Sequence, residues 1–167
     1  GGIFAALNFR VRGEELPYLV NKAEPKVLFV GSRYVDIVNS ARPQLSPVKH
    51  YIVIDGKAEG MLNYDELLAS GSPEEKTFAE VKDEDIALLL FTAGTTGFPK
   101  GVPQAHNAYS TYVLTNVNPP DLEAPAETNV LCMPLYHVAG MQALMAGIYG
   151  GRTVALMRQF DEEEWFK

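Results

Sequence analysis

Disulfide pairs, membrane-length apolar runs and basic clusters are all missing from this sequence of 167 residues. Cys132 is the single cysteine, so no disulfide forms within the chain and a reducing compartment, the cytoplasm, is the expected location. Cys132 lies in an apolar run, which favours a buried structural thiol over a nucleophile. No apolar stretch reaches the roughly 18 residues of a membrane span, so no transmembrane segment is expected. Fourteen basic against 21 acidic residues argue against a nucleic-acid partner.

The composition is that of an ordinary globular domain. Hydrophobic residues make up 47% and charged residues 21% of the chain, and 167 residues are enough to bury a core. The chain starts at Gly1-Gly2 in sequence typical of the middle of a domain, and stops at Lys167 beside an acidic segment. We therefore expect a piece of a longer protein.

Apolar runs and helical patterns alternate along the chain. This alternation predicts an α/β fold with a layered, largely parallel sheet and flanking helices. Proline and acidic residues predict a surface loop over 116–128. Strands are expected at 27–30, 51–54, 86–91, 130–135 and 153–157. Helices are expected at 14–23, 34–41, 61–69 with Leu62 and Leu68 inward, 107–113 with Asn107 as cap, 138–149 buried between layers, and after Asp161.

The apolar run 86–91 reads as a strand buried on both faces, and it leads into a ten-residue loop, 92–101, of unusual composition. Gly94, Gly97 and Gly101 let the backbone approach an anion without a Cβ in the way. Three threonines add hydroxyl donors and a lysine adds a cation; they are Thr92, Thr95, Thr96 and Lys100. The composition fits a phosphate-binding loop, and it also fits a glycine-rich surface turn with a solvated lysine.

Two widespread phosphate loops are excluded by spacing. The pattern GxxxxGK[ST] fails because Pro99 stands where its second glycine belongs and Gly101 follows the lysine. The pattern GxGxxG fails because Gly94 and Gly97 are three apart with no glycine at position 92.

The loop resembles the signature of the adenylate-forming superfamily, which includes acyl-CoA synthetases, luciferases and peptide-synthetase adenylation domains. The family pattern (S/T)(S/A)GTTGxPKG matches residues 92–101, and His106 follows as in the family. Ala93 stands where serine is usual, which removes one hydroxyl donor. Pro103 cannot donate to a ladder, so the strand after the loop is expected at an edge or very short.

A second motif, 134–140, reads PLYHVAG and is expected between a strand and a helix. On its own, His137 is more often a structural donor than a catalyst. The family carries a similar Pro-Leu-(Phe/Tyr)-His-x-x-Gly motif, so the resemblance implies that Tyr136, His137 and Gly140 line the side of the site that takes the carboxylate substrate. Asn8-Phe9-Arg10 and Phe160-Asp161 also resemble family segments.

The resemblance implies that residues 1–167 are part of an N-terminal AMP-binding domain whose C-terminal domain is absent. The expected cosubstrates are ATP, CoA and a carboxylic acid, with Mg²⁺ as metal and Thr95 as its nearest ligand. Lys100 and His137 are the expected catalytic residues, and residues 92–97, Lys100 and Gly101 (with Ala93 and Gly94 among them) the expected nucleotide-binding set. The family's YGxTE motif does not occur in the sequence. Alone, the piece is expected to make no acyl-CoA.

The sequence leaves alternatives open. The parent is expected to activate a fatty acid as acyl-AMP and transfer it to CoA. An adenylation domain that passes an amino or aryl acid to a carrier protein, or a non-catalytic nucleotide-binding module, would carry the same loop. Asp83-Glu84-Asp85 is expected to be a solvated acidic cap rather than a metal cluster.

Overall fold

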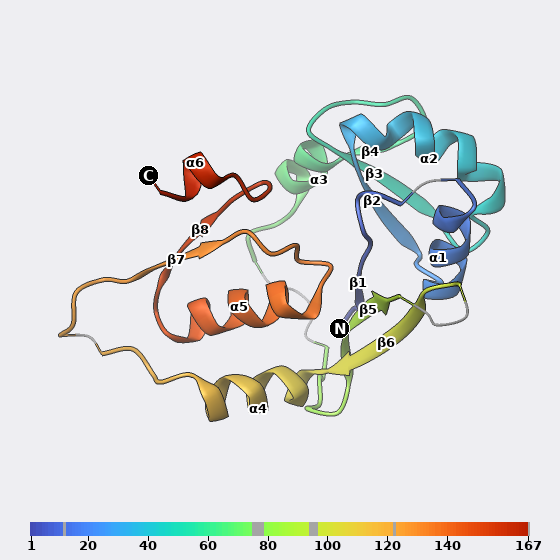
Figure 1. Cartoon of the computed structure of the whole chain (residues 1–167). Helices are drawn as coiled ribbons and strands as arrows, with labels where there is room; N and C mark the ends of the chain where they lie inside the picture. Colours follow the sequence, from blue (N-terminus) through green and yellow to red (C-terminus); the bar gives the residue numbers. More distant parts are fainter. Residues whose placement is uncertain (12, 75–78, 94–96, 122, 167) are drawn as a thin grey trace. The chain divides into compact units, whose positions relative to one another are not determined.

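The computed structural model describes residues 1–11, 13–74, 79–93, 97–121 and 123–166 (Figure 1). These residues fall into two compact units. The first unit contains residues 1–8, 81–93 and most of 100–166. The second contains most of 9–80, together with residues 97–99.

A three-stranded sheet with β5 in the middle organises the first unit. Parallel β1 pairs with one side of β5 and antiparallel β6 with the other, with Phe4 opposite Leu88 and Thr92 opposite Lys100. A separate parallel pair joins β7 to β8. The elements of this unit are β1 (Phe4–Ala6), β5 (Ile86–Thr92), β6 (Lys100–Ala105), α4 (His106–Asn116), β7 (Thr128–Leu131), α5 (Val138–Tyr149), β8 (Thr153–Leu156) and α6 (Glu162–Trp165).

The core of the first unit joins β5 to two helices. Leu88 of β5, Tyr109 of α4 and Met141 of α5 form a buried cluster. Leu135 and Met145 pack against it, together with Ala87. The cluster therefore fixes α4 and the start of α5 against the strand that leads into the 92–101 loop.

A fully parallel sheet in the order β2-β3-β4 organises the second unit. Its core includes Leu19 and Val20 of α1 and Val53 of β3, which have almost no exposed surface. Helix α1 ends at Glu24, whose left-handed backbone lets its N–H donate to the Val20 carbonyl at 3.0 Å. The elements are α1 (Glu15–Ala23), β2 (Val27–Gly31), the 3₁₀ turn Ser32–Tyr34, α2 (Val35–Ala41), the 3₁₀ turn Arg42–Gln44, β3 (His50–Ile54), β4 (Leu62–Asn63) and α3 (Tyr64–Ser70).

The fold confirms the predicted α/β class, with parallel pairing at every strand contact described except β5–β6. No helix among the described residues is long and apolar enough to cross a membrane.

The helix predicted at 61–69 is wrong at its start. Leu62 belongs to strand β4, and α3 begins at Tyr64 because the Asn63 side chain caps it by accepting the Glu66 N–H at 2.8 Å. Leu62 and Leu68 are 45% and 67% exposed rather than inward. The seven residues of α3 are too short for one apolar face to dictate which side is buried.

Four further predictions need correction. The strand predicted at 130–135 spans Thr128–Leu131, since the chain turns before Pro134. Helix α5 has the predicted bounds but is not buried all round: Val138 and Ile148 are 41% and 62% exposed, because its packing partners, mainly α4, β7 and β8, cover only part of its surface. Strand β5 buries Leu88 and Leu90 fully and its alternate residues only partly, and Cys132 is half-buried.

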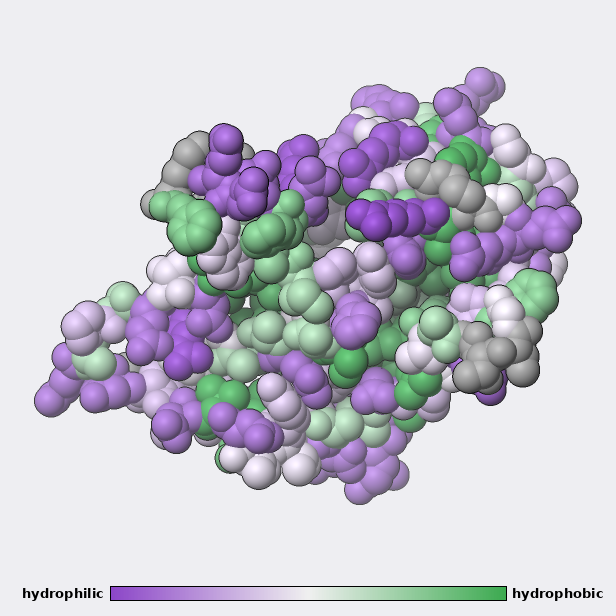
Figure 2. All heavy atoms as spheres, viewed as in Figure 1, coloured by the Kyte–Doolittle hydropathy of each residue, from purple (hydrophilic) through white to green (hydrophobic). Residues whose placement is uncertain are grey.

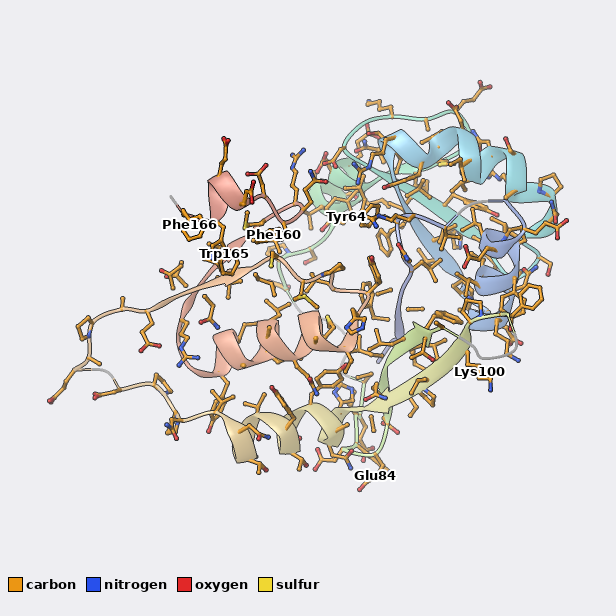
Figure 3. The ribbon with its side chains drawn as sticks, viewed as in Figure 1. Tyr64, Glu84, Lys100, Phe160, Trp165 and Phe166 are labelled. Carbon is orange, nitrogen blue, oxygen red and sulfur yellow. The ribbon has the colours of Figure 1, made fainter. Side chains whose placement is uncertain are left out.

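Apolar side chains also remain exposed around α6. Phe160 and Trp165 contact each other, with ring centroids 5.9 Å apart, and Phe166 lies beside them (Figures 2 and 3). In Figure 2, green hydrophobic atoms lie next to purple hydrophilic ones in the region where Figure 3 labels Phe160 and Phe166.

Candidate active site

The hairpin β5–β6 presents the ends of the 92–101 loop. Thr92 and Lys100 are cross-strand partners, and the Thr92 hydroxyl donates to the Lys100 carbonyl at 3.5 Å, the limit for such a bond. Both side chains are exposed at the end of the hairpin, as is Ala93 (Figure 3 labels Lys100). The structure therefore brings a hydroxyl and a cation together where the sequence predicted a phosphate site.

Two loop glycines have a clear structural requirement. Gly97 has φ of +96°, a backbone conformation that L side chains rarely adopt. At Gly101 a Cβ would lie 3.2 Å from Leu89 Cδ1 and 3.5 Å from Phe91 Cε1, so a side chain there would press on the strand opposite. Gly94, Thr95 and Thr96 lie outside the described residues, and their predicted roles, including Thr95 as metal ligand, stay predictions.

Pro103 occupies the predicted position. It pairs with Leu89 in β6, the outer strand of the three-stranded sheet that the structure describes, where a missing N–H costs no ladder bond. Helix α4 follows directly, one residue earlier than predicted.

The acidic turn 83–85 caps α4 through its backbone. The N–H of His106 donates to the Asp85 carbonyl at 3.1 Å, and the N–H of Asn107 donates to the Asp83 carbonyl at 2.9 Å. The predicted side-chain cap by Asn107 is wrong, because the N-cap position is Ala105 and Asn107 lies within the first turn of α4. No group of three or more His, Cys, Asp or Glu able to hold a metal occurs among the residues the structure describes.

The 134–140 motif forms a turn that ends in the N-cap of α5. The His137 N–H donates to the Pro134 carbonyl at 3.0 Å, and His137 Nδ1 accepts the N–H of Ala139 at 3.3 Å. A neutral imidazole that accepts at Nδ1 carries its proton on Nε2. The exposed His137 ring therefore presents Nε2–H as a donor, while Tyr136 beside it is half-buried.

Gly140 is required by packing. A Cβ there would overlap the Pro134 carbonyl oxygen and lie 2.8 Å from the Pro134 carbonyl carbon and 2.9 Å from the Met133 oxygen. Real Cβ atoms do not approach backbone so closely, so only glycine lets the first turn of α5 lie against the turn before it. This packing sets the position of His137, and Gly140 itself is buried.

Both motifs are attached to one core. Leu88 lies four residues before Thr92, and Leu135, directly before Tyr136, packs against the Leu88–Tyr109–Met141 cluster.

Sequence reasoning missed Tyr109, whose hydroxyl is buried with no hydrogen-bond partner in the described part of the chain. Burial raises the pKa of Tyr109 above its ordinary value.

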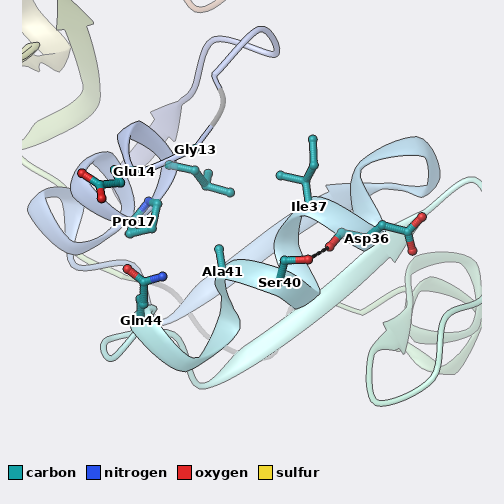
Figure 4. Close-up of a pocket in the computed structure, with 9 residues that line it drawn as sticks. Gly13, Glu14, Pro17, Asp36, Ile37, Ser40, Ala41 and Gln44 are labelled. Atoms are coloured by element: carbon teal, nitrogen blue, oxygen red, sulfur yellow. Dashed lines mark hydrogen bonds between the residues drawn. The ribbon is translucent and has the colours of Figure 1, made fainter.

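A groove in the second unit is a poor phosphate site. It has a volume of about 400 Å³ and lies between α1 and α2, where Pro17 and Ala41 form opposite walls (Figure 4). Its charged lining residues are Glu14 and Asp36, which would repel a phosphate. The cation that the sequence predicted for phosphate is Lys100, on the hairpin of the other unit.

Comparison with known proteins decides the family. The model of the AMP-binding enzyme family matches residues 1–167, the whole chain. This chain belongs to the AMP-binding enzyme family. Indoleacetate–CoA ligase of Aromatoleum aromaticum is 29% identical over 167 residues, covering 99% of the chain and 32% of that protein. Long-chain-fatty-acid–CoA ligase of Thermus thermophilus is 34% identical over 141 residues, covering 83% of the chain and 25% of that protein.

Solved structures share the fold of this AMP-binding chain. The anthranilate–CoA ligase AuaEII in complex with anthranoyl-AMP superposes with a TM-score of 0.82 at 24% identity, covering 95% of this chain and 31% of that one. ATP-bound MatB from Rhodopseudomonas palustris gives a TM-score of 0.78 at 23% identity, covering 99% and 32%. The chain thus spans about a quarter to a third of the length of these proteins.

Proposed function

We propose that this chain is the part of a longer acid–CoA ligase that holds the ATP phosphates and one wall of the acid site. The hairpin that carries the 92–101 signature, with Thr92 opposite Lys100 at its end, is the observation that carries the proposal. The family match over the whole chain and the CoA ligases among its relatives support it.

The proposed reaction has two steps. A carboxylate oxygen attacks the α-phosphorus of ATP, the bond to the bridging oxygen breaks, and pyrophosphate leaves with that electron pair. The sulfur of CoA then attacks the acyl carbon of the acyl-AMP, AMP leaves, and the thiol proton passes to solvent. Lys100 and the loop hydroxyls hold the outer phosphates and stabilise the charge that develops on the departing pyrophosphate. Mg²⁺ is the expected metal, and Thr95, its predicted ligand, lies outside the residues that the structure describes.

His137 is proposed to orient the acid. Its Nε2–H points away from the helix that its Nδ1 caps, so it can donate to an acyl carboxylate or α-phosphate oxygen. An apolar acid is the proposed substrate class. The relatives named above act on a long-chain fatty acid in one case and on indoleacetate in the other, and both fit this class.

The test is acid-dependent exchange between pyrophosphate and ATP in the full-length protein. Lys100→Ala should slow exchange by roughly ten- to a hundredfold, the effect of losing one charge-assisted contact of about 1.5–3 kcal/mol. Lys57→Ala is the matched control, because Lys57 is an exposed lysine whose described partner is Glu66. Equal exchange rates in the two variants and the wild type would refute the role of Lys100.

A further inference from the structure

A contact within the second unit holds the outgoing arm of the signature loop. The Tyr18 ring on α1 packs on the Phe98 ring, with centroids 4.8 Å apart and planes at 39°. The Tyr18 hydroxyl also donates to the Pro99 carbonyl at 3.2 Å. One side chain thus binds two consecutive loop residues in two different ways.

Tyr18 lies on a helix that is packed into the core of the second unit. Its neighbours on α1, Leu19 and Val20, are fully buried in the core of the unit, and Leu16 is buried one turn earlier. Phe98 by contrast is 56% exposed, so it adds little to that core. A phenylalanine in a loop of glycines and threonines therefore gains most from its aromatic partner.

We propose that Tyr18 is a positioning residue for the phosphate loop. It fixes Phe98 and the Pro99 carbonyl, and Pro99 leads directly into Lys100, so the arm that carries the cation is ordered before nucleotide binds. Ordering a glycine-rich segment costs conformational entropy, and binding is stronger where the segment is already ordered before the ligand arrives. The inference rests on the function proposed above.

The hydroxyl distinguishes positioning from simple packing. A ring that only covered Phe98 would serve equally well as phenylalanine. The hydrogen bond to Pro99 orients a backbone carbonyl, which a phenylalanine ring at position 18 cannot do. Loss of the hydroxyl alone should therefore be visible in nucleotide binding.

The experiment measures pyrophosphate exchange against ATP concentration in the full-length protein. Tyr18→Phe removes the hydrogen bond and should raise the KM for ATP about two- to fivefold, with kcat nearly unchanged. Tyr18→Leu and Phe98→Leu each remove the ring pair and should raise KM by about three- to tenfold. Tyr64→Phe is the matched control, because its ring packs on Phe29 at 6.3 Å instead of on the loop.

The double variant Tyr18→Leu/Phe98→Leu completes a cycle. If Tyr18 and Phe98 act through one contact, the KM of the double variant should be close to that of the worse single variant. If they act independently, the two increases in KM should multiply. Multiplicative effects, or a KM for ATP unchanged in Tyr18→Phe or in Phe98→Leu, would overturn the inference. Phe98 is largely exposed, so its variant tests the contact even if Tyr18→Leu fails to fold.

The failure of the proposed function has a different signature. In that case the wild type would show no acid-dependent exchange, or Lys100→Ala would exchange as fast as the wild type. If the wild type exchanges, Lys100→Ala does not, and the Tyr18 and Phe98 variants keep the wild-type KM for ATP, only the positioning role is refuted.

Discussion

The hydroxyl of Tyr109 lies among apolar side chains, between Leu88 of β5 and Met141 of α5. The residue is 6% exposed, and its hydroxyl has no hydrogen-bond partner among the residues described. A buried polar group without a partner costs about 1–3 kcal/mol of stability. Burial also raises the pKa of Tyr109, because the phenolate is the form that loses most by leaving water.

Tyr109→Phe should therefore stabilise the full-length protein by about 1 kcal/mol. The wild type should also lose stability above pH 10, since the unfolded phenol releases its proton near its ordinary pKa of about 10 while the folded one keeps it. Urea unfolding at pH 7 and at pH 10.5 measures both effects. Tyr112→Phe, on the same helix and half-exposed, is the control. A loss of stability in Tyr109→Phe would mean that the hydroxyl has a partner after all.

Helix α5 combines a structural and a proposed chemical role at its first turn. His137 caps the helix through Nδ1, which leaves Nε2 for the proposed contact with substrate, and Gly140 allows the turn to lie against Pro134. The capping role and the proposed substrate-binding role of His137 can be tested separately. Asparagine also accepts hydrogen bonds at an N-cap, but it has no group that reaches as far as Nε2.

His137→Ala should lower the free energy of unfolding by about 1 kcal/mol through loss of the cap, and His137→Asn should not. Both variants should slow adenylation by about tenfold or more, the effect of losing one hydrogen bond to a charged group. Thermal unfolding and pyrophosphate exchange on the same samples give the two readouts. Full exchange activity in His137→Asn would show that His137 acts only as a helix cap and does not orient the acid.

These elements also show what the sequence could and could not predict. The bounds of α5 followed from one continuous apolar stretch closed by Gly150-Gly151, and the edge position of β6 followed from Pro103. Strand β1 was missed, since three residues carry no periodicity and the pairing with β5 is decided by tertiary contacts. The loop signature could be recognised in the sequence because its residues are consecutive. The contact of Tyr18 with Pro99 could not be predicted, because the two residues are 81 positions apart.

At the scale of the whole molecule, the choice of acid depends on which side chains line the acid site. The turn 134–140 brings a tyrosine, a histidine and apolar residues, and no carboxylate. An amino acid would place an ammonium group in the site, and a buried ammonium needs an anionic partner. The composition of the turn therefore fits the proposed apolar acid.

Pyrophosphate exchange by the full-length protein can be compared with palmitate, indoleacetate and phenylalanine as the acid. The kcat/KM for phenylalanine should be at least about tenfold lower than for the other two, because burying its unpaired ammonium group costs about 1.4 kcal/mol or more. CoA added after adenylation should then release AMP. Preference for phenylalanine, with no release of AMP by CoA, would favour an adenylation domain that serves a carrier protein.

The pairing of Phe4 with Leu88 has a consequence for biosynthesis. Strand β1 leaves the ribosome before residues 9–80 of the second unit, whereas its partner β5 leaves after them. At about 5–20 residues per second, the nascent β1 waits several seconds without its partner. During that interval the parallel sheet β2-β3-β4 can already close, so the order of translation lets most of the second unit fold before β1 meets β5.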